Sequence, residues 1–173
     1  KLDASGKSKW AHRYGSNAEL QLSGSARVDL HPLGSVVLAG WFDGTVDFGG
    51  PTPFSARNGH DLALVRFDPG GKTRYAIQIE TDRKPCSSND CVLDEIALSV
   101  DADGAVAVAA PFEGEARLSG GARITSAGKT ALLLVKLTPK GEILWLDQVG
   151  VADGICQSPA CSFLSASPSA TSV

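Results

Sequence analysis

The sequence contains no methionine, and aromatic residues make up only 6% of its 173 positions. Its 16 lysine and arginine residues are scattered singly and are outnumbered by 19 acidic residues, so no basic surface for a nucleic-acid backbone is expected. No apolar run approaches the roughly 18 residues of a membrane-spanning helix, and no segment keeps a helical hydrophobic period. The sequence therefore predicts neither a nucleic-acid partner nor a membrane span, and it favours a globular chain of strands.

The beginning of the chain lacks two familiar signals. Residues 1–6, Lys-Leu-Asp-Ala-Ser-Gly, have neither the basic nor the apolar region of a secretory signal peptide. Position 1 is not a methionine. We therefore expect a processed product or an internal piece of a longer polypeptide, with any export signal upstream.

Motifs for catalysis and for metal or cofactor binding are also missing. The sequence has no His-Glu-x-x-His motif, no nucleophile elbow and no histidine pair at ligand spacing, and His60 is interpreted as a turn residue. The segment Asp101–Gly104 resembles part of a calcium loop, but it offers two carboxylates where calcium takes about six to eight oxygens. A hairpin turn is favoured there. We predict no enzyme activity, no catalytic residues, no metal site and no cofactor.

A sequence unit recurs along the chain. Three segments align without gaps at offsets of 65 and 70, and each leads through a glycine turn to an aromatic residue: Leu2–Trp10, Phe67–Tyr75 and Leu137–Trp145. Fixed periods of this kind are typical of repeat architectures, in which each unit buries its faces against its neighbours. We expect a single region of approximate units 1–30 (partial), 31–103 and 104–173.

Each complete unit is expected to contain four strands. Those of the middle unit are Val36–Trp41, Asp61–Phe67, Thr73–Ile79 and Glu95–Val100, and Lys9–Tyr14 is the counterpart of the third. Runs such as Leu62–Val65 and Ala131–Val135 are apolar on both faces, whereas a strand half open to water would alternate. The predicted fold class is therefore all-β: β-propeller blades of four antiparallel strands, about two and a half of them, in a ring that is incomplete or completed by oligomerisation.

The residues also resemble a known family. The stretches Val36–Gly50 and Asp61–Lys72 are similar to the SBBP-type bacterial β-propeller repeat, which occurs in long secreted or surface proteins of myxobacteria and related groups. The resemblance covers nearly the whole chain and implies an exported propeller, without catalytic residues to carry over. The chain departs from the pattern in its cysteine loops and in Asp29–Gly34, which is taken to be two residues longer than the Asp101–Gly104 turn.

The four cysteines form two pairs at equivalent places in two units. Cys86 and Cys91 recur with the same spacing as Cys156 and Cys161 of the next unit. This pattern suggests one disulfide within each loop, and hence an oxidising location that is extracellular, periplasmic or at the cell surface. A four-cysteine zinc site and free thiols are the alternatives.

The recurring aromatics Trp10, Tyr75 and Trp145 are expected to pack between sheets, and a sugar-binding array is the alternative. Trp41, whose counterpart is Pro111, is the candidate for an exposed ligand contact. The leading functional hypothesis is a non-enzymatic, exported structural or binding module that is part of a larger propeller. Its partners would be the remaining blades of the parent chain or other protein chains. Carbohydrate or cell-surface recognition, with a glycan as partner, is the second hypothesis, and a hydrolase or lyase with its site in the central channel is the third.

Overall fold

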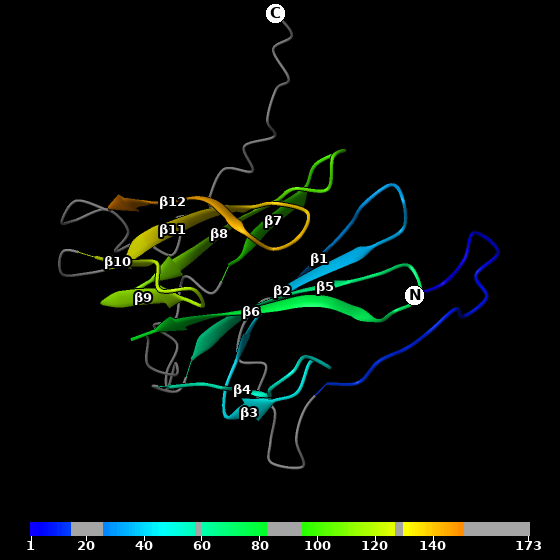
Figure 1. The fold of residues 1–173 in the computed structure, drawn as a ribbon, viewed down its shortest axis with the longest axis horizontal. Helices are drawn as coiled ribbons and strands as arrows, with labels where there is room; N and C mark the ends of the chain where they lie inside the picture. The colour runs from blue at the N-terminus through cyan, green and yellow to red at the C-terminus, as the bar shows by residue number, and fades with distance from the viewer. Residues whose placement is uncertain (15–25, 58–59, 83–94, 127–129, 151–173) are drawn as a thin grey trace, which may run out of the picture.

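The computed structural model describes residues 1–14, 26–57, 60–82, 95–126 and 130–150, and within them it contains strands and turns but no helix. The predicted all-β class is therefore confirmed. These residues contain twelve strands, which are labelled in chain order in Figure 1. They are β1 Ala26–Leu30, β2 Val36–Phe42, β3 Thr45–Val46, β4 Phe54–Ser55, β5 Asp61–Phe67, β6 Thr73–Thr81, β7 Ala97–Val100, β8 Val106–Phe112, β9 Glu115–Leu118, β10 Arg123–Thr125, β11 Ala131–Leu137 and β12 Ile143–Gly150.

The strands form three antiparallel sheets. The first sheet has six strands in the order β1-β2-β5-β6-β9-β10, the second has four in the order β12-β11-β8-β7, and β3 pairs with β4 alone. β2 and β5 pair from Val36↔Phe67 to Phe42↔Asp61, and β8 and β11 pair in the equivalent register of the next repeat. We call residues 26–81 the first unit and residues 97–150 the second unit. The described residues do not close into a ring.

The unit boundaries differ from those expected. β7, the expected last strand of the middle unit, pairs with β8 and so belongs to the following sheet. Boundaries at residues 30/31 and 103/104 would cut hairpins β1–β2 and β7–β8. The two hairpin turns also have equal length, because Gly34 donates its N–H to the carbonyl of His31 just as Gly104 does to Asp101. The expectation of a longer Asp29–Gly34 loop is wrong, and Asp101–Gly104 forms a hairpin turn.

Each unit contains a hairpin that the sequence analysis missed. β3–β4 follows β2, and β9–β10 follows β8. These strands have only two to four residues, too few for a hydrophobic period to be recognised. β9 leaves its own unit and pairs with the end of β6, from Ile79↔Leu118 to Thr81↔Ala116. The second unit therefore contributes two strands to the first sheet.

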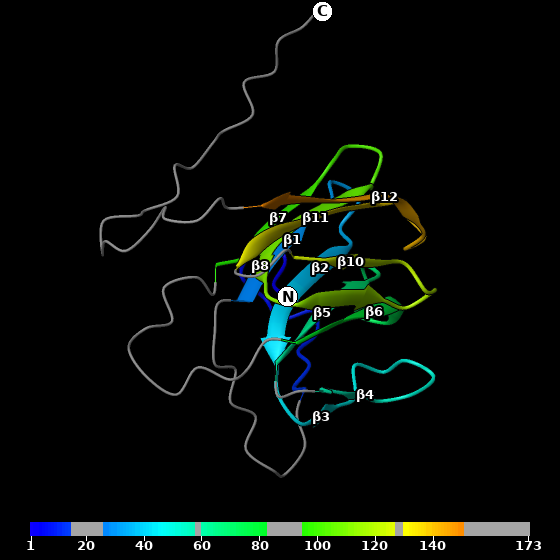
Figure 2. The same ribbon diagram turned by 90° about the vertical axis from the view of Figure 1, so that its left-hand side faces the viewer.

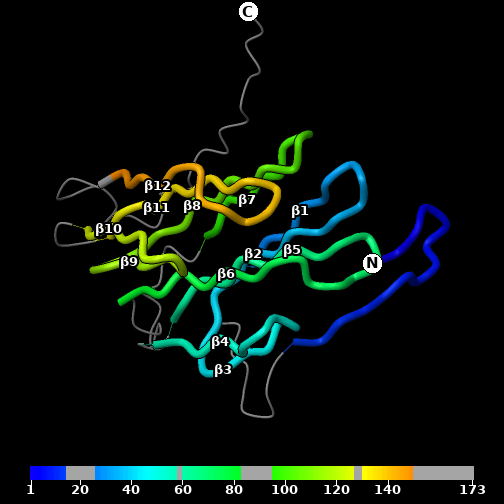
Figure 3. The backbone as a smooth tube through the Cα atoms, viewed as in Figure 1, coloured from blue at the N-terminus to red at the C-terminus, as the bar shows by residue number. Residues whose placement is uncertain are grey.

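The expected strand Lys9–Tyr14 is not formed. The only β-pairing described in the N-terminal segment is an isolated bridge between Leu2 and Ser8. β6, its counterpart, pairs with β5 from Thr73 to Ile79, whereas ahead of residue 9 only Lys1 and Leu2 correspond to residues of β5. Figure 3 shows this blue segment passing the β5–β6 turn and continuing toward β3 and β4.

The two units bury their faces unequally. Every residue of β5 is buried, whereas β11 alternates between buried and half-buried residues. One apolar cluster lies between the first and second sheets, and a smaller one lies on the opposite face of the first sheet, where Trp10 and Tyr14 join it. Figure 2 shows the second sheet on one side of the first and hairpin β3–β4 on the other. The first unit is therefore enclosed on two faces, and the second unit on one.

Candidate functional site

The interface between the two units, which we call the seam, contains an aromatic ring held over a turn glycine. Gly141 has φ of +90°, which the Pro139–Gly141 turn requires, and a Cβ there would lie 2.8 Å from Cγ of Tyr75. Trp10 lies over Gly71 in the same way, with φ of +91° and 2.9 Å to the indole Cγ. Trp10 and Tyr75 thus occupy the same position relative to a turn glycine. Trp145 differs, because it is 47% exposed.

A cation bonded to a turn carbonyl is the second repeated feature. Arg66 is buried and donates from Nη1 to the carbonyl of Gly104, and Lys1, its counterpart in the preceding repeat, donates from Nζ to the carbonyl of Gly34. The two carbonyls occupy the same position in successive repeats and close equivalent turns. The next counterpart, Lys136, lies 3.8 Å from Asp101 of its own unit. In both cases a cation of one unit therefore donates a hydrogen bond to the turn between the first two strands of the unit that follows.

Trp41 does not have the exposure expected of a ligand contact. Its side chain is 1% exposed, inside the cluster between the sheets, and its ring stacks on His60 at a centroid distance of 6.5 Å. Strand β2 is covered on both faces, so a large aromatic side chain on it has no route to solvent. The assignment of Trp41 as an exposed ligand contact is corrected to a core residue.

His60 is more than the expected turn residue. It is fully buried, and its Nδ1 hydrogen-bonds to Oδ1 of Asp43, which follows β2. In the second unit the corresponding pair is Thr130, whose hydroxyl donates to Oε1 of Glu113 at 2.9 Å. Side-chain hydrogen bonds at equivalent positions thus join the end of β2 to the start of β5 in the first unit and the end of β8 to the start of β11 in the second. Because His60 has no exposed surface, a substrate cannot reach it, and the pair stabilises the strand ends.

Asp61 is a buried carboxyl at the start of β5. Its Oδ1 accepts the N–H of Thr81 at 2.9 Å, and its Oδ2 accepts the side-chain amide of Gln78 at 2.6 Å and the N–H of Arg57 at 3.2 Å. Burial raises the pKa of Asp61 above its ordinary value of 3.8, and the nearby Glu80 carboxylate raises it further, although these three hydrogen bonds oppose the rise. The dominant effect is the loss of hydration of the charged form.

We expect Asp61 to stabilise the fold less as the pH rises. A carboxyl whose pKa is raised by folding stabilises the protein fully below the unfolded value, near 3.8, and loses that contribution as the pH rises through the folded value. The measurement is the free energy of unfolding from urea titrations between pH 3 and 7 for the protein and for Asp61→Asn, which cannot titrate. The stability advantage of the wild type over the variant should shrink with rising pH. An advantage that grows would show that the hydrogen bonds outweigh the desolvation.

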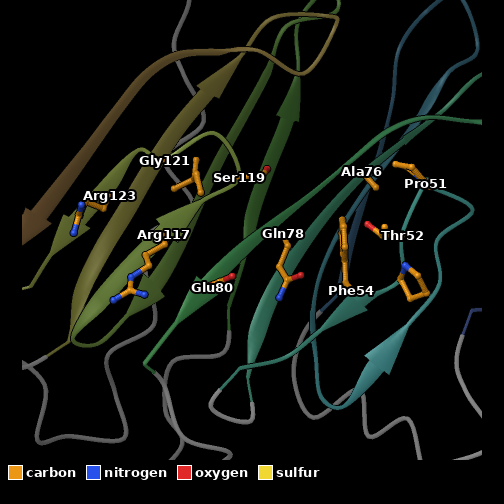
Figure 4. A pocket seen from close by; sticks show the side chains of 13 residues that line it. Pro51, Thr52, Phe54, Ala76, Gln78, Glu80, Arg117, Ser119, Gly121 and Arg123 are labelled. Atoms are coloured by element: carbon orange, nitrogen blue, oxygen red, sulfur yellow. The ribbon is translucent and has the colours of Figure 1, made fainter.

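An open groove of about 660 Å³ lies over β6, between residues 50–54 and hairpin β9–β10. Figure 4 shows Gln78 and Glu80 on β6 between Phe54 of the first hairpin and Arg117 of the second. Its charged groups have partners within the protein: Glu80 pairs with Arg57 at 3.1 Å, and Arg117 and Arg123 share Glu115, at 2.5 Å and 3.7 Å. These pairs reduce the charge that the groove could offer to a ligand.

Several predicted features receive no structural description. Cys86, Cys91, Cys156 and Cys161 all lie outside the described residues. Within the described part of the chain, no three His, Cys, Asp or Glu side chains are grouped as they would be to hold a metal ion. The same residues include no helix long and apolar enough to span a membrane.

No family model, curated protein or solved structure matches the chain. The resemblance to a propeller repeat thus gains no support from these comparisons.

The role of Arg66 was not predicted from the sequence, in which it is one of the scattered cations. Its alignment with Lys1 and Lys136 nevertheless places a cation at the same position of three units. That recurrence was the signal available. The alignment could not predict that Arg66 is buried, because the turns that enclose it are distant from it in the sequence.

Proposed function

We propose that this chain is a non-enzymatic structural module of an exported β-propeller, in which four-stranded sheets stack face to face and further sheets of the same kind complete the ring. The observation that carries the proposal is a pair of equivalent faces. In the first unit this face is covered by the second unit, and in the second unit none of the described residues packs over the same face.

The equivalent faces can be followed residue by residue. Leu64 and Ile77 of the first unit belong to the cluster between the sheets. Their counterparts in the second unit, Leu134 and Asp147, lie on the face of β11 and β12 that points away from that cluster, because successive side chains of a strand alternate between faces. Val149, the counterpart of Ile79, is 52% exposed, whereas Ile79 is 1% exposed. A sheet packed on this face would bury side chains whose counterparts are already buried.

The divergence of the two sheets supports a ring over a straight stack. Their first strands touch: Asp29 accepts the N–H of Val100 at 2.7 Å, and His31 Nε2 bonds the carbonyl of Ala102 at 2.9 Å. The last strands of the two units, β6 and β12, are separated by hairpin β9–β10, which extends the first sheet and which Figure 2 shows between them. Each unit is therefore wedge-shaped, narrow at β1 or β7 and wide at β6 or β12. Wedges that stack in one direction turn about an axis, as propeller blades do.

The partner is a further unit with two specific elements. It would present a turn glycine to Trp145, as Gly141 is presented to Tyr75, and a turn carbonyl to Lys136, as Gly104 is presented to Arg66. Such a unit can come from the parent polypeptide or from another chain. Export of this module is part of the proposal through the paired cysteines, which favour an oxidising compartment.

Supplying the missing unit tests the proposal. Residues 170–173 match residues 97–100 in sequence, so the chain extended after Val173 by a second copy of residues 101–150 contains a third complete unit. We expect the extension to bury Trp145, to protect its fluorescence from acrylamide quenching and to raise the free energy of unfolding. Trp145→Ser should cost little in the original chain and about 2 kcal/mol in the extended one, because only there is the ring buried.

The serine substitution also provides the control. If Trp145 remains quenchable in the extended chain, or if Trp145→Ser costs the same in both chains, the open face does not receive a further unit.

A further inference from the structure

A cavity of about 550 Å³, wide open to solvent, lies at the turn end of the seam and is formed by both units together. Arg66 and Tyr75 of the first unit line it, and Pro139 and Lys140 of the second unit face them. Its volume lies within the roughly 300–1,000 Å³ of small-molecule sites. This cavity is separate from the groove of Figure 4 and from the open face of the second unit.

Arg66 brings a buried positive charge to this cavity without an acidic partner. It is 7% exposed, and its guanidinium donates to the carbonyls of Gly104 and Pro139 and to the hydroxyl of Ser35. None of the ion pairs among the described residues includes it. A guanidinium has five N–H groups, and three are accounted for by these bonds. Because buried charges are normally paired with an opposite charge, the remaining donors are suited to an anion.

The hydroxyl of Tyr75, a residue that lines the same cavity, is a second polar group without a well-aligned partner. It is buried, and its neighbouring donor is the Arg66 side chain, whose alignment is too poor for a regular hydrogen bond. Burial raises the pKa of Tyr75, and the positive charge of Arg66 and this poorly aligned hydrogen bond with its side chain oppose that rise. A buried hydroxyl without a well-aligned partner costs free energy unless something else bonds to it.

The charges around the cavity leave an excess of one cation. Its lining includes three cations, Arg66, Arg74 and Lys140, and two carboxylates, Asp68 and Asp103. Arg74 lies 3.6 Å from Asp68, so these two largely neutralise each other. Lys140 and Arg66 remain, one on each side of the seam, opposed by Asp103. The field in the cavity therefore favours a negatively charged ligand.

We propose that this cavity binds a small oxyanion, a carboxylate or sulfate group on a body about the size of a monosaccharide. The anion accepts hydrogen bonds from the free N–H groups of Arg66, whose planar fork matches a carboxylate or sulfate. The Tyr75 hydroxyl donates a further bond, and Lys140 contributes charge from the second unit. The site is complete within the two described units and does not depend on a third.

The equivalent place at the N-terminal end of the chain would not bind such a ligand. There Lys1 replaces Arg66, and Trp10, in place of Tyr75, already donates its indole N–H to the carbonyl of Pro69 at 3.0 Å. Lysine lacks the planar fork, and no hydroxyl is left over. The proposal is therefore specific to the seam between the two complete units.

The test is a titration of the protein with sodium glucuronate, glucose 6-sulfate and inorganic sulfate at constant ionic strength, followed by calorimetry and by amide chemical shifts. Tyr75→Phe removes only a hydroxyl without a well-aligned hydrogen bond, and Lys140→Gln changes an exposed residue, so neither should disturb the fold. We expect each to weaken binding by about five- to tenfold. Lys72→Gln, an exposed charge in the neighbouring turn and outside the cavity, should leave the affinity within about twofold, as the matched control.

Each result supports or overturns the proposal. Saturable binding of any of the three anions, with shifts at Tyr75 and Lys140 and none with uncharged glucose, supports it, and the preferred anion identifies the head group. The absence of saturation at tens of millimolar anion would overturn it. So would binding that Tyr75→Phe leaves unchanged, or binding that Lys72→Gln weakens as much as Lys140→Gln does.

Discussion

Replacing Trp41 by alanine is expected to lower the free energy of unfolding by about 3–5 kcal/mol, the usual cost of removing a large buried aromatic side chain. The side chain is 1% exposed and lies between the two units, where it stacks on His60 and where β2 pairs it with Leu62 of β5. Its removal would leave a cavity that two covered strands cannot close. Urea denaturation followed by far-ultraviolet circular dichroism measures the loss without relying on tryptophan fluorescence.

Trp145→Ala is the matched control for Trp41→Ala. Trp145 is 47% exposed on the open face of the second unit, so its removal should cost about 0.5 kcal/mol in the same assay. If both variants lose equal stability, the burial difference between the two tryptophans is wrong. If Trp41→Ala costs little, Trp41 is available for the ligand contact that its sequence position first indicated.

Gly141→Ala is expected to destabilise the protein by about 1–3 kcal/mol more than Gly121→Ala. Both glycines have φ of +90°, so the strain of a left-handed alanine is common to the two variants. At Gly121 an added Cβ would meet nothing within 4 Å, whereas at Gly141 it would lie 2.8–3.1 Å from three ring atoms of Tyr75. The difference between the two measured losses therefore isolates the contact between the turn and the ring across the seam.

A double mutant identifies the cause of that difference. In a Tyr75→Ala background the added methyl of Gly141→Ala has no ring to meet, so its cost should fall to that of Gly121→Ala. An undiminished cost would place the strain within the turn itself. In that case the aromatic ring would not be what links the first unit to the second.

The strands of the two units could be located from the sequence because their signals are local. Asp61–Phe67 and Ala131–Leu137 are apolar on both faces and are followed by turns that need glycine at positive φ, and both are strands with the predicted bounds. The short hairpins β3–β4 and β9–β10 could not be located, because they have no period of their own and β9 is paired by a strand of the neighbouring unit.

The candidate site was predictable only in part. The recurrence of Trp10 and Tyr75 beside a glycine turn was visible in the sequence, and both rings lie over a turn glycine of the following unit. Trp41 was predicted to be exposed because its counterpart in the next unit, Pro111, is not aromatic. Its burial depends on the second unit, which covers it, and no local sequence pattern predicts that cover. The His60–Asp43 pair joins residues on opposite sides of hairpin β3–β4, and so it could not be recognised before that hairpin was known.

The sequence by itself determined the longer strands of the two complete units and their period, since strand propensity and turn geometry depend on a few neighbouring residues. It also placed a cation at the same position of three units. Only the tertiary structure decided that Arg66 is buried and that Lys136 is not enclosed in the same way. The physical reason is that a side chain on a sheet face becomes buried only when a second surface packs over it. Turns of the second unit surround Arg66, whereas no described unit follows Lys136.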